Sequence, residues 1–155
     1  MIRNVIKFTS LGILFVALAS AIIYGIGYWK YQNSPEYRAE QNLKKLEKKY
    51  AEDPYGGETP EETLRLFIDA LKKGDTDLAA KYFILDKQEE WQEDLAKLQE
   101  KNLLDETILD LEKVKLSKKT EETAFFTLAD ENNIAISQLI IDKNLINNKW
   151  KISEF

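Results

Sequence analysis

The apolar positions of this chain follow three patterns in succession. Residues 8–29 form one uncharged and mostly apolar run. From about residue 35 to residue 100, apolar residues recur every three or four positions, which is the period of an amphipathic helix. From Thr107 onward they mostly alternate with polar residues, as in strands that bury one face. Helices followed by a meander of strands predict an α+β fold.

The clearest helix signal begins at Thr59. Thr59 can cap a helix, Pro60 suits its first position, and Glu62 completes a capping box. Gly74 can adopt the left-handed conformation that ends helices. Asp75 or Thr76 can then cap a second, short helix that folds back on the first. The buried stripe expected for the first helix is Leu64, Phe67, Ile68 and Leu71, and that for the second is Leu78, Ala79, Tyr82 and Phe83.

A third helix and a sheet are expected after Phe83. Asp86 with Glu89 repeats the capping pattern and should open a helix that buries Trp91, Leu95 and Leu98. We expect four antiparallel strands beyond it, with turns at residues 130–133 and 147–148. The first strand should contain Leu109, Leu111, Val114 and Leu116, with a bulge near residues 112–113. A second bulge is expected between Ile136 and Leu139, where the alternation changes phase.

The apolar run predicts a membrane anchor. As a helix, its 22 residues would span about 33 Å at about 1.5 Å per residue, enough for a bilayer core of about 30 Å. We assign residues 1–7 to a short basic tail and residues 8–30 to a transmembrane helix, whose aromatic far end suits the membrane interface. A cleaved signal peptide is the alternative, but apolar sequence continues beyond the formal cleavage sites, which favours an uncleaved anchor.

The segment between the anchor and the domain is read as a stalk. Ser34 can cap a helix that carries apolar residues at Ala39, Leu43, Leu46 and Tyr50. Residues 31–58 therefore form a juxtamembrane helical stalk and linker, and the domain is assigned to residues 59–155. The short basic tail favours a domain on the extracytoplasmic side of the cell membrane. Lysines in the stalk argue the reverse, so a cytoplasmic domain stays open as an alternative.

Composition narrows the classes of function. Up to Glu58 there are eight Lys and Arg against six Asp and Glu, a net charge of +2; beyond it there are 14 against 21, a net charge of −7. Such an acidic domain would repel phosphates, so nucleic acid is not an expected partner. The chain has no Cys and no His, which excludes thiol nucleophiles, imidazole bases and zinc sites built on either.

The remaining candidates for chemistry are carboxylates and tyrosines. The acidic residues Glu89, Glu90, Glu93 and Asp94 are interpreted as the solvated face of one helix rather than a cation site. The chain has no glycine-rich phosphate loop. We therefore assign no metal, no cofactor and no catalytic residue.

Several short motifs resemble nuclear-transport-factor-2-like (cystatin-like) domains. They are Pro-Glu-Glu at 60–62, Leu-Lys-Lys-Gly-Asp at 71–75, Ala-Ala-Lys-Tyr-Phe at 79–83 and Asn-Asn-Lys-Trp-Lys-Ile at 147–152. The resemblance implies helices packed on a curved, cone-like four-stranded sheet. A pocket between the helices and the sheet would be lined by Phe67, Tyr82, Trp91, Phe126 and Trp150, although aromatic residues at such periods more often form plain core.

The resemblance leaves two classes of function. The leading expectation is a non-catalytic module that binds a ligand, an unidentified protein partner or a second copy of itself through the sheet face or the groove between helices and sheet. The alternative is a small-molecule-binding or isomerase/cyclase-type enzyme on the same fold. Ketosteroid isomerases of this superfamily use a pocket aspartate and a tyrosine, and the nearest residue types here are Tyr82, Asp86 and Asp110.

Overall fold

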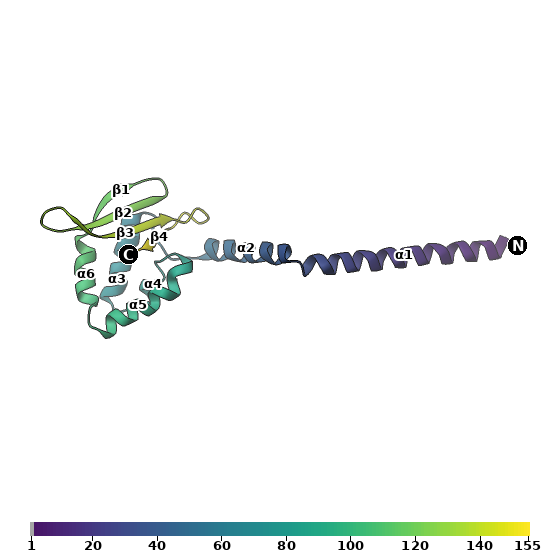
Figure 1. Ribbon diagram of the computed structural model, residues 1–155, viewed down its shortest axis with the longest axis horizontal. Coiled ribbons are helices and arrows are strands. Elements are labelled where there is room, and N and C mark those ends of the chain that lie inside the picture. The colour runs from purple at the N-terminus through teal and green to yellow at the C-terminus, as the bar shows by residue number, and fades with distance from the viewer. Residues whose placement is uncertain (1) are drawn as a thin grey trace. The chain divides into compact units, whose positions relative to one another are not determined.

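The computed structural model (Figure 1) describes residues 2–155, with side chains from residue 16 onward. The chain divides into two compact units, Met1–Glu47 and Lys48–Phe155. The first contains helix α1 (Ile2–Gln32) and most of helix α2 (Pro35–Glu52). The hydroxyl oxygen of Ser34 accepts a hydrogen bond from the Tyr37 amide at 3.1 Å, so the predicted cap of the stalk helix is confirmed.

Only part of the predicted anchor lies within the residues whose side chains the structure describes. Among residues 16–155, whose side chains the structure describes, no helix is apolar over a sufficient length to cross a membrane. The tail at 1–7 and residues 8–15 of the predicted span lie outside those residues, so the anchor stays a prediction.

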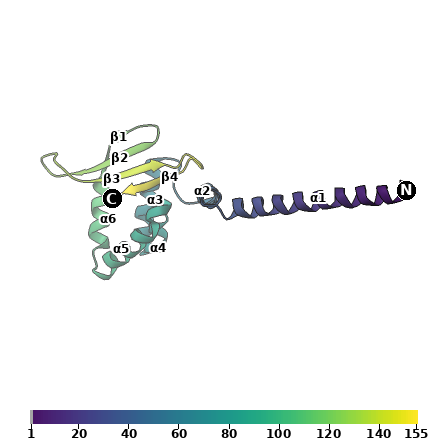
Figure 2. The same cartoon turned by 45° about the vertical axis from the view of Figure 1, so that its right-hand side comes forward.

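The second unit is an α+β fold, as predicted. Its helices precede a four-stranded antiparallel sheet in the order β1-β2-β3-β4. Both views show the helices on one side of this sheet (Figures 1 and 2). The elements are α3 (Pro60–Lys72), α4 (Thr76–Ala80), the 3₁₀ turn η1 (Leu85–Lys87), α5 (Gln88–Glu100), α6 (Leu104–Lys113), β1 (Lys115–Lys119), β2 (Thr123–Ala129), β3 (Ala135–Lys143) and β4 (Trp150–Glu154).

The caps of α3 and α4 agree with the sequence. The Thr59 hydroxyl accepts from the Glu62 amide at 3.1 Å, and Asp75 accepts from the Leu78 amide at 2.9 Å. The Glu62 carboxylate accepts from the Glu58 amide at 2.8 Å, one residue before the partner that a capping box uses. Gly74 has a φ of 69°, which explains why a glycine ends this helix.

The predicted first strand is wrong over its first half, because residues 104–113 form helix α6. Leu104, Ile108 and Leu111 are four and three positions apart and are buried together, whereas Leu109 is exposed. The alternation of Leu109 with Leu111 was therefore a fragment of a helical period. The predicted bulge at 112–113 is absent, and the irregularity of β1 lies between Leu116 and Lys118.

The start of the third helix also differs from the prediction. A 3₁₀ turn that includes Asp86 comes first, and α5 begins at Gln88 without a side-chain cap. The helical backbone at Lys87 continues from that turn, so no capping residue is needed there. Leu95 is fully buried as expected, and Trp91 and Leu98 pack against the core while half-buried.

The first turn and the second bulge of the sheet are confirmed, whereas the turn predicted at 147–148 is part of a longer connection, residues 144–149, between β3 and β4. Asp130 accepts from the amides of Asn132 at 2.9 Å and Ile134 at 2.8 Å, which fixes the β2–β3 turn. Leu128 pairs with Ser137 but Ala129 pairs with Ala135, so Ile136 has no partner across the strands. The extra residue lies where the alternation changes phase, as a bulge requires.

Strand β4 is joined to the start of the compact unit. Gly57 pairs with Trp150 and Phe83 with Ile152 on the edge of β4 that faces away from β3. Gly56 has a φ of 110°, and a Cβ there would come within 2.5 Å of the Trp150 carbonyl oxygen. Residues 53–57, which the sequence assigns to the linker before the domain, are thus part of the folded unit.

Thr63 connects these segments and should be sensitive to substitution. Its buried hydroxyl donates to the Trp150 carbonyl at 2.9 Å and accepts from the Gly57 amide at 2.9 Å. We expect Thr63→Val to lower the free energy of unfolding by about 1–3 kcal/mol, because two buried backbone groups lose their partner without a change in volume. Chemical denaturation measures the loss, and Thr107→Val, which removes a half-buried hydroxyl, is the control. Equal losses in the two variants would contradict this role.

Candidate ligand pocket

The five aromatic residues predicted to line a pocket lie in or against the core. Phe67, Tyr82, Phe126 and Trp150 are buried and Trp91 is half-buried. The structure brings two of them together around Phe155, whose ring centroid lies 6.2 Å from that of Phe67 and 5.5 Å from that of Trp91. Phe83, between them in sequence, stacks on Trp91 at 4.5 Å. This cluster fills space between α3 and α5.

The other three predicted residues lie elsewhere, and Phe126 is in the middle of β2, opposite Leu116 and Leu139. The Tyr82 ring packs edge-on against Tyr55 at 6.3 Å, and Trp150 lies under the Lys119 ammonium at 5.8 Å. Burial raises the pKa of Tyr82, with smaller contributions from Tyr55 and nearby aspartates, so the phenol stays protonated at neutral pH. Neither of the two hollows described next is lined by any of the five predicted residues.

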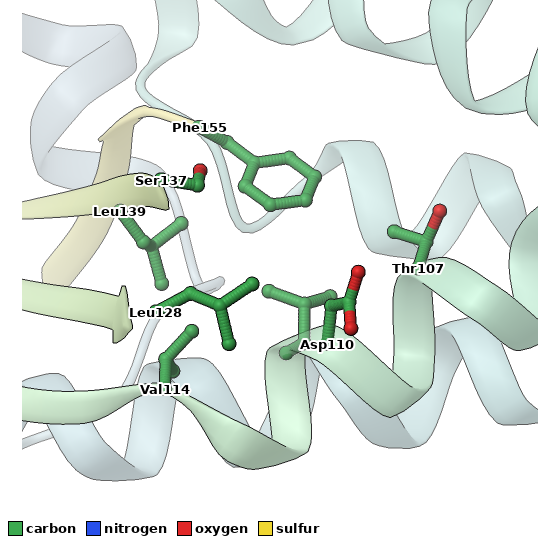
Figure 3. A pocket seen from close by; sticks show the side chains of 8 residues that line it. Thr107, Asp110, Val114, Leu128, Ser137, Leu139 and Phe155 are labelled. Atoms are coloured by element: carbon green, nitrogen blue, oxygen red, sulfur yellow. The ribbon is translucent and has the colours of Figure 1, made fainter. Parts of the chain in front are cut away.

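The first hollow lies between α6 and the sheet and has a volume of about 170 Å³. Figure 3 shows the ring of Phe155 on one side of it and Leu128, Val114 and Asp110 on the other. Its apolar walls come from α6, β2, β3 and the residue after β4. The full lining is Thr107, Asp110, Leu111, Val114, Leu128, Ser137, Leu139 and Phe155.

The polar groups of this hollow cannot act as a buried acid or base. The Asp110 side chain is about half exposed and accepts from the Lys113 ammonium at 3.0 Å. The Thr107 hydroxyl donates to the Leu103 carbonyl at 3.0 Å within its own helix. Of the three residues considered for an isomerase-like site, only Asp110 lines the hollow; Tyr82 and Asp86 do not.

The second hollow is a wider and more open groove of about 300 Å³ between α3 and α6. Leu64, Ile68 and Leu111 form its apolar floor. The charges on its rim neutralise one another at the surface, where such pairs contribute little to stability. The rim pairs are Arg65 with Asp69 at 3.7 Å, Lys72 with Glu112 at 2.5 Å and Lys119 with Glu61 at 3.5 Å.

One buried carboxylate exists away from both hollows. Asp53 and Lys151 have side chains that are 4% and 3% exposed, and Oδ2 lies 2.5 Å from Nζ. The two opposite charges form a buried ion pair, and the ammonium also donates to the Lys81 carbonyl at 2.7 Å. Burial lowers the pKa of Lys151 and Asp53 opposes that shift. Sequence reasoning missed this pair, because a carboxylate in a turn and a lysine in a strand both ordinarily face water.

The acidic face of α5 has no arrangement suited to a cation. Within the described part of the chain, no group of three or more acidic side chains is placed to hold a metal ion.

Comparison with known proteins does not identify a function, because no protein-family model, no curated protein and no solved structure matches this chain. The function is therefore inferred from the chemistry of the described residues.

Proposed function

We propose that this chain is a single-pass cell-envelope protein, held in the cell membrane by residues 8–30, whose folded unit binds a partner without catalysis. The observation that carries the proposal is the hollow between α6 and the sheet, which is apolar, open to solvent and without a buried titratable group. The absence of His and Cys from the sequence agrees with binding rather than turnover. The anchor rests on the uncharged run at 8–29.

The fold family and orientation belong to the same proposal. We place the folded unit among nuclear-transport-factor-2-like domains and on the extracytoplasmic side. The supports are the order of elements, helices followed by a four-stranded antiparallel meander, together with the Trp-Lys-Ile strand at its end. The basic residues Arg3 and Lys7 before the apolar run support the orientation.

The volume of the hollow indicates what it binds. An apolar cavity of about 150 Å³ takes one benzene ring, so a hollow of about 170 Å³ suits one ring or one branched aliphatic side chain. Pockets for ligands of ordinary size run from about 300 to 1,000 Å³. This difference weighs against an isomerase or cyclase site in this hollow and favours a single apolar side chain of a partner protein.

Site-specific photo-crosslinking in intact cells tests the proposal. A photoreactive phenylalanine at Thr107, which lines the hollow, should give one discrete adduct with a protein partner. The same residue at Leu109, which is exposed on the same helix but does not line the hollow, is the matched control and should not give that adduct. Ser137→Phe should fill the hollow and reduce the adduct at position 107 several-fold.

Other outcomes of this experiment separate the alternatives. Equal adducts at 107 and 109, or none at either, would contradict binding through the hollow. The photoreactive residue can also replace Phe125, on the opposite face of β2. An adduct of twice the chain's mass from that position would indicate a homodimer through the sheet face. Release of the chain by an alkaline carbonate wash of the same membranes would contradict the anchor, and protection from external protease would place the domain in the cytoplasm.

A further inference from the structure

The turn between β3 and β4 presents two neighbouring aliphatic side chains to solvent. Leu145 is 64% exposed and Ile146 is 49% exposed. They follow one another at the tip of the turn, so both can enter the same apolar medium. Single exposed aliphatic residues are ordinary on protein surfaces, but an adjacent pair at a tip is a shape that can penetrate a soft surface.

The tip is held in one conformation by the asparagines around it. The side-chain oxygen of Asn144 accepts a hydrogen bond from the Ile146 amide at 2.9 Å, and the backbone carbonyl of Asn144 accepts one from the Asn148 amide at 2.8 Å. Asn148 has a φ of 61°, a conformation that asparagine tolerates better than most residues. Because the turn is already ordered, inserting its tip would cost little additional conformational entropy.

The same asparagines attach the turn to the first residues of the compact unit. The side-chain amides of Asn144 and Asn147 donate to the Tyr50 carbonyl at 3.0 Å and 2.8 Å, and Asn147 also donates to the Asp53 carbonyl at 3.0 Å. The tip therefore lies beside the point where the chain enters the unit. In sequence, that point follows the predicted membrane span.

The charge of this region is opposite to that of the unit as a whole. Residues 143–153 contain three lysines and no acidic residue, although residues 59–155 carry a net charge of −7. Lys149 pairs with Glu58 at 2.6 Å and Lys151 is buried with Asp53. Among the described residues, Lys143 and Lys49 have no carboxylate within 4.0 Å, which leaves two lysines near the tip able to meet anionic groups.

We propose that the β3–β4 turn docks on an anionic lipid surface, with Leu145 and Ile146 inserted at the headgroup boundary and Lys143 and Lys49 facing lipid phosphates. This inference rests on the proposed anchor at residues 8–30. Two side chains are too small a patch for a protein interface, which takes about 800 Å² per partner, whereas a lipid surface accepts individual side chains without a matching shape.

The tether makes such weak insertion effective. Trp29 and Lys48 are 19 residues apart in sequence, which even fully extended reach about 65 Å. The unit would therefore stay within that distance of the bilayer, at a local concentration on the order of millimolar. An apolar tip together with basic residues combines the two contributions on which binding to a membrane surface depends, buried apolar area and attraction to anionic lipids.

The cysteine-free sequence allows a direct test. We would prepare the full chain with Leu145→Cys, or with the matched control Leu109→Cys, which is 55% exposed on α6. Each would carry the same environment-sensitive fluorophore and be reconstituted into vesicles of phosphatidylcholine and phosphatidylserine that contain nitroxide-labelled lipid. We expect quenching at position 145 to be several-fold stronger than at position 109, and to weaken when Lys143→Glu is added or when phosphatidylserine is omitted.

Three results would overturn the inference or one part of it, and they are distinguishable from one another. If the chain resists a carbonate wash but position 145 is quenched no more than position 109, the anchor stands and the docking is wrong. If the chain is washed from the vesicles, the anchor itself is wrong and the docking falls with it. Quenching at 145 that is indifferent to both Lys143→Glu and phosphatidylserine would overturn the role of anionic lipid.

Discussion

Asp53→Ala should lower the free energy of unfolding of the compact unit by about 3–5 kcal/mol. The substitution leaves the Lys151 ammonium buried without its counter-charge, still donating to the Lys81 carbonyl at 2.7 Å and 6.0 Å from the Tyr55 ring centroid, and it removes the acceptor of the Tyr55 amide at 3.0 Å. A buried charge without a counter-charge is among the most destabilising changes a fold can undergo. Denaturant unfolding followed by tryptophan fluorescence would measure the loss.

The double variant Asp53→Ala with Lys151→Met separates the charge effect from simple loss of packing. It should be more stable than Asp53→Ala alone, because the uncompensated charge is gone and the coupling between the two sites is large. Asp94→Ala removes an exposed carboxylate that pairs with Lys97 at 2.8 Å and serves as the surface control, with an expected loss below about 1 kcal/mol. A similarly small loss for Asp53→Ala would show that the pair is open to water.

Phe67→Ala should cost about 3–5 kcal/mol of unfolding free energy, the range for truncating a buried aromatic side chain. Phe67 is fully buried, and its ring lies 5.4 Å from the Phe83 ring and 6.2 Å from the Phe155 ring, so truncation would leave a cavity inside the aromatic cluster. Thermal or denaturant unfolding of the same unit measures this change.

Phe125→Ala is the matched control for Phe67→Ala. Phe125 is half-buried and carries the Lys118 ammonium at 5.9 Å, so its loss should cost about 1 kcal/mol or less. If Phe67 instead lined an open ligand pocket, as one interpretation of the sequence held, the two variants would differ little. A large difference would assign Phe67 to the core.

The sequence sufficed for elements that carry their own local signals. Thr59, Pro60 and Gly74 set the bounds of α3 because caps, a first-turn proline and a left-handed glycine act within a few residues. The bulge at Ile136 was predictable because an extra residue shifts the phase of the alternation in the same strand. Such features depend little on the rest of the fold.

Prediction from the sequence failed where a short pattern fits both the helical and the strand period, and where interacting residues are far apart in the chain. Residues 107–111 satisfy alternation as well as helical spacing, and only the burial of Leu104 and Ile108 against the core decides for a helix. The pairing of Asp53 with Lys151 joins residues almost a hundred positions apart, and the hollow beside α6 depends on where that helix packs. No local sequence motif predicts either the buried pair or the hollow.

The pairing of Gly57 and Phe83 with β4 bears on the order in which the unit can form. During synthesis, the residues near Gly57 and helix α3 emerge before their partners Trp150, Lys151 and Ile152, which are made about 90 residues later. Contacts of such long sequence separation form slowly, and they cannot form at all on an unfinished chain. The nascent unit would therefore keep its apolar helix faces uncovered until β4 has left the ribosome, which makes it a candidate client for chaperones.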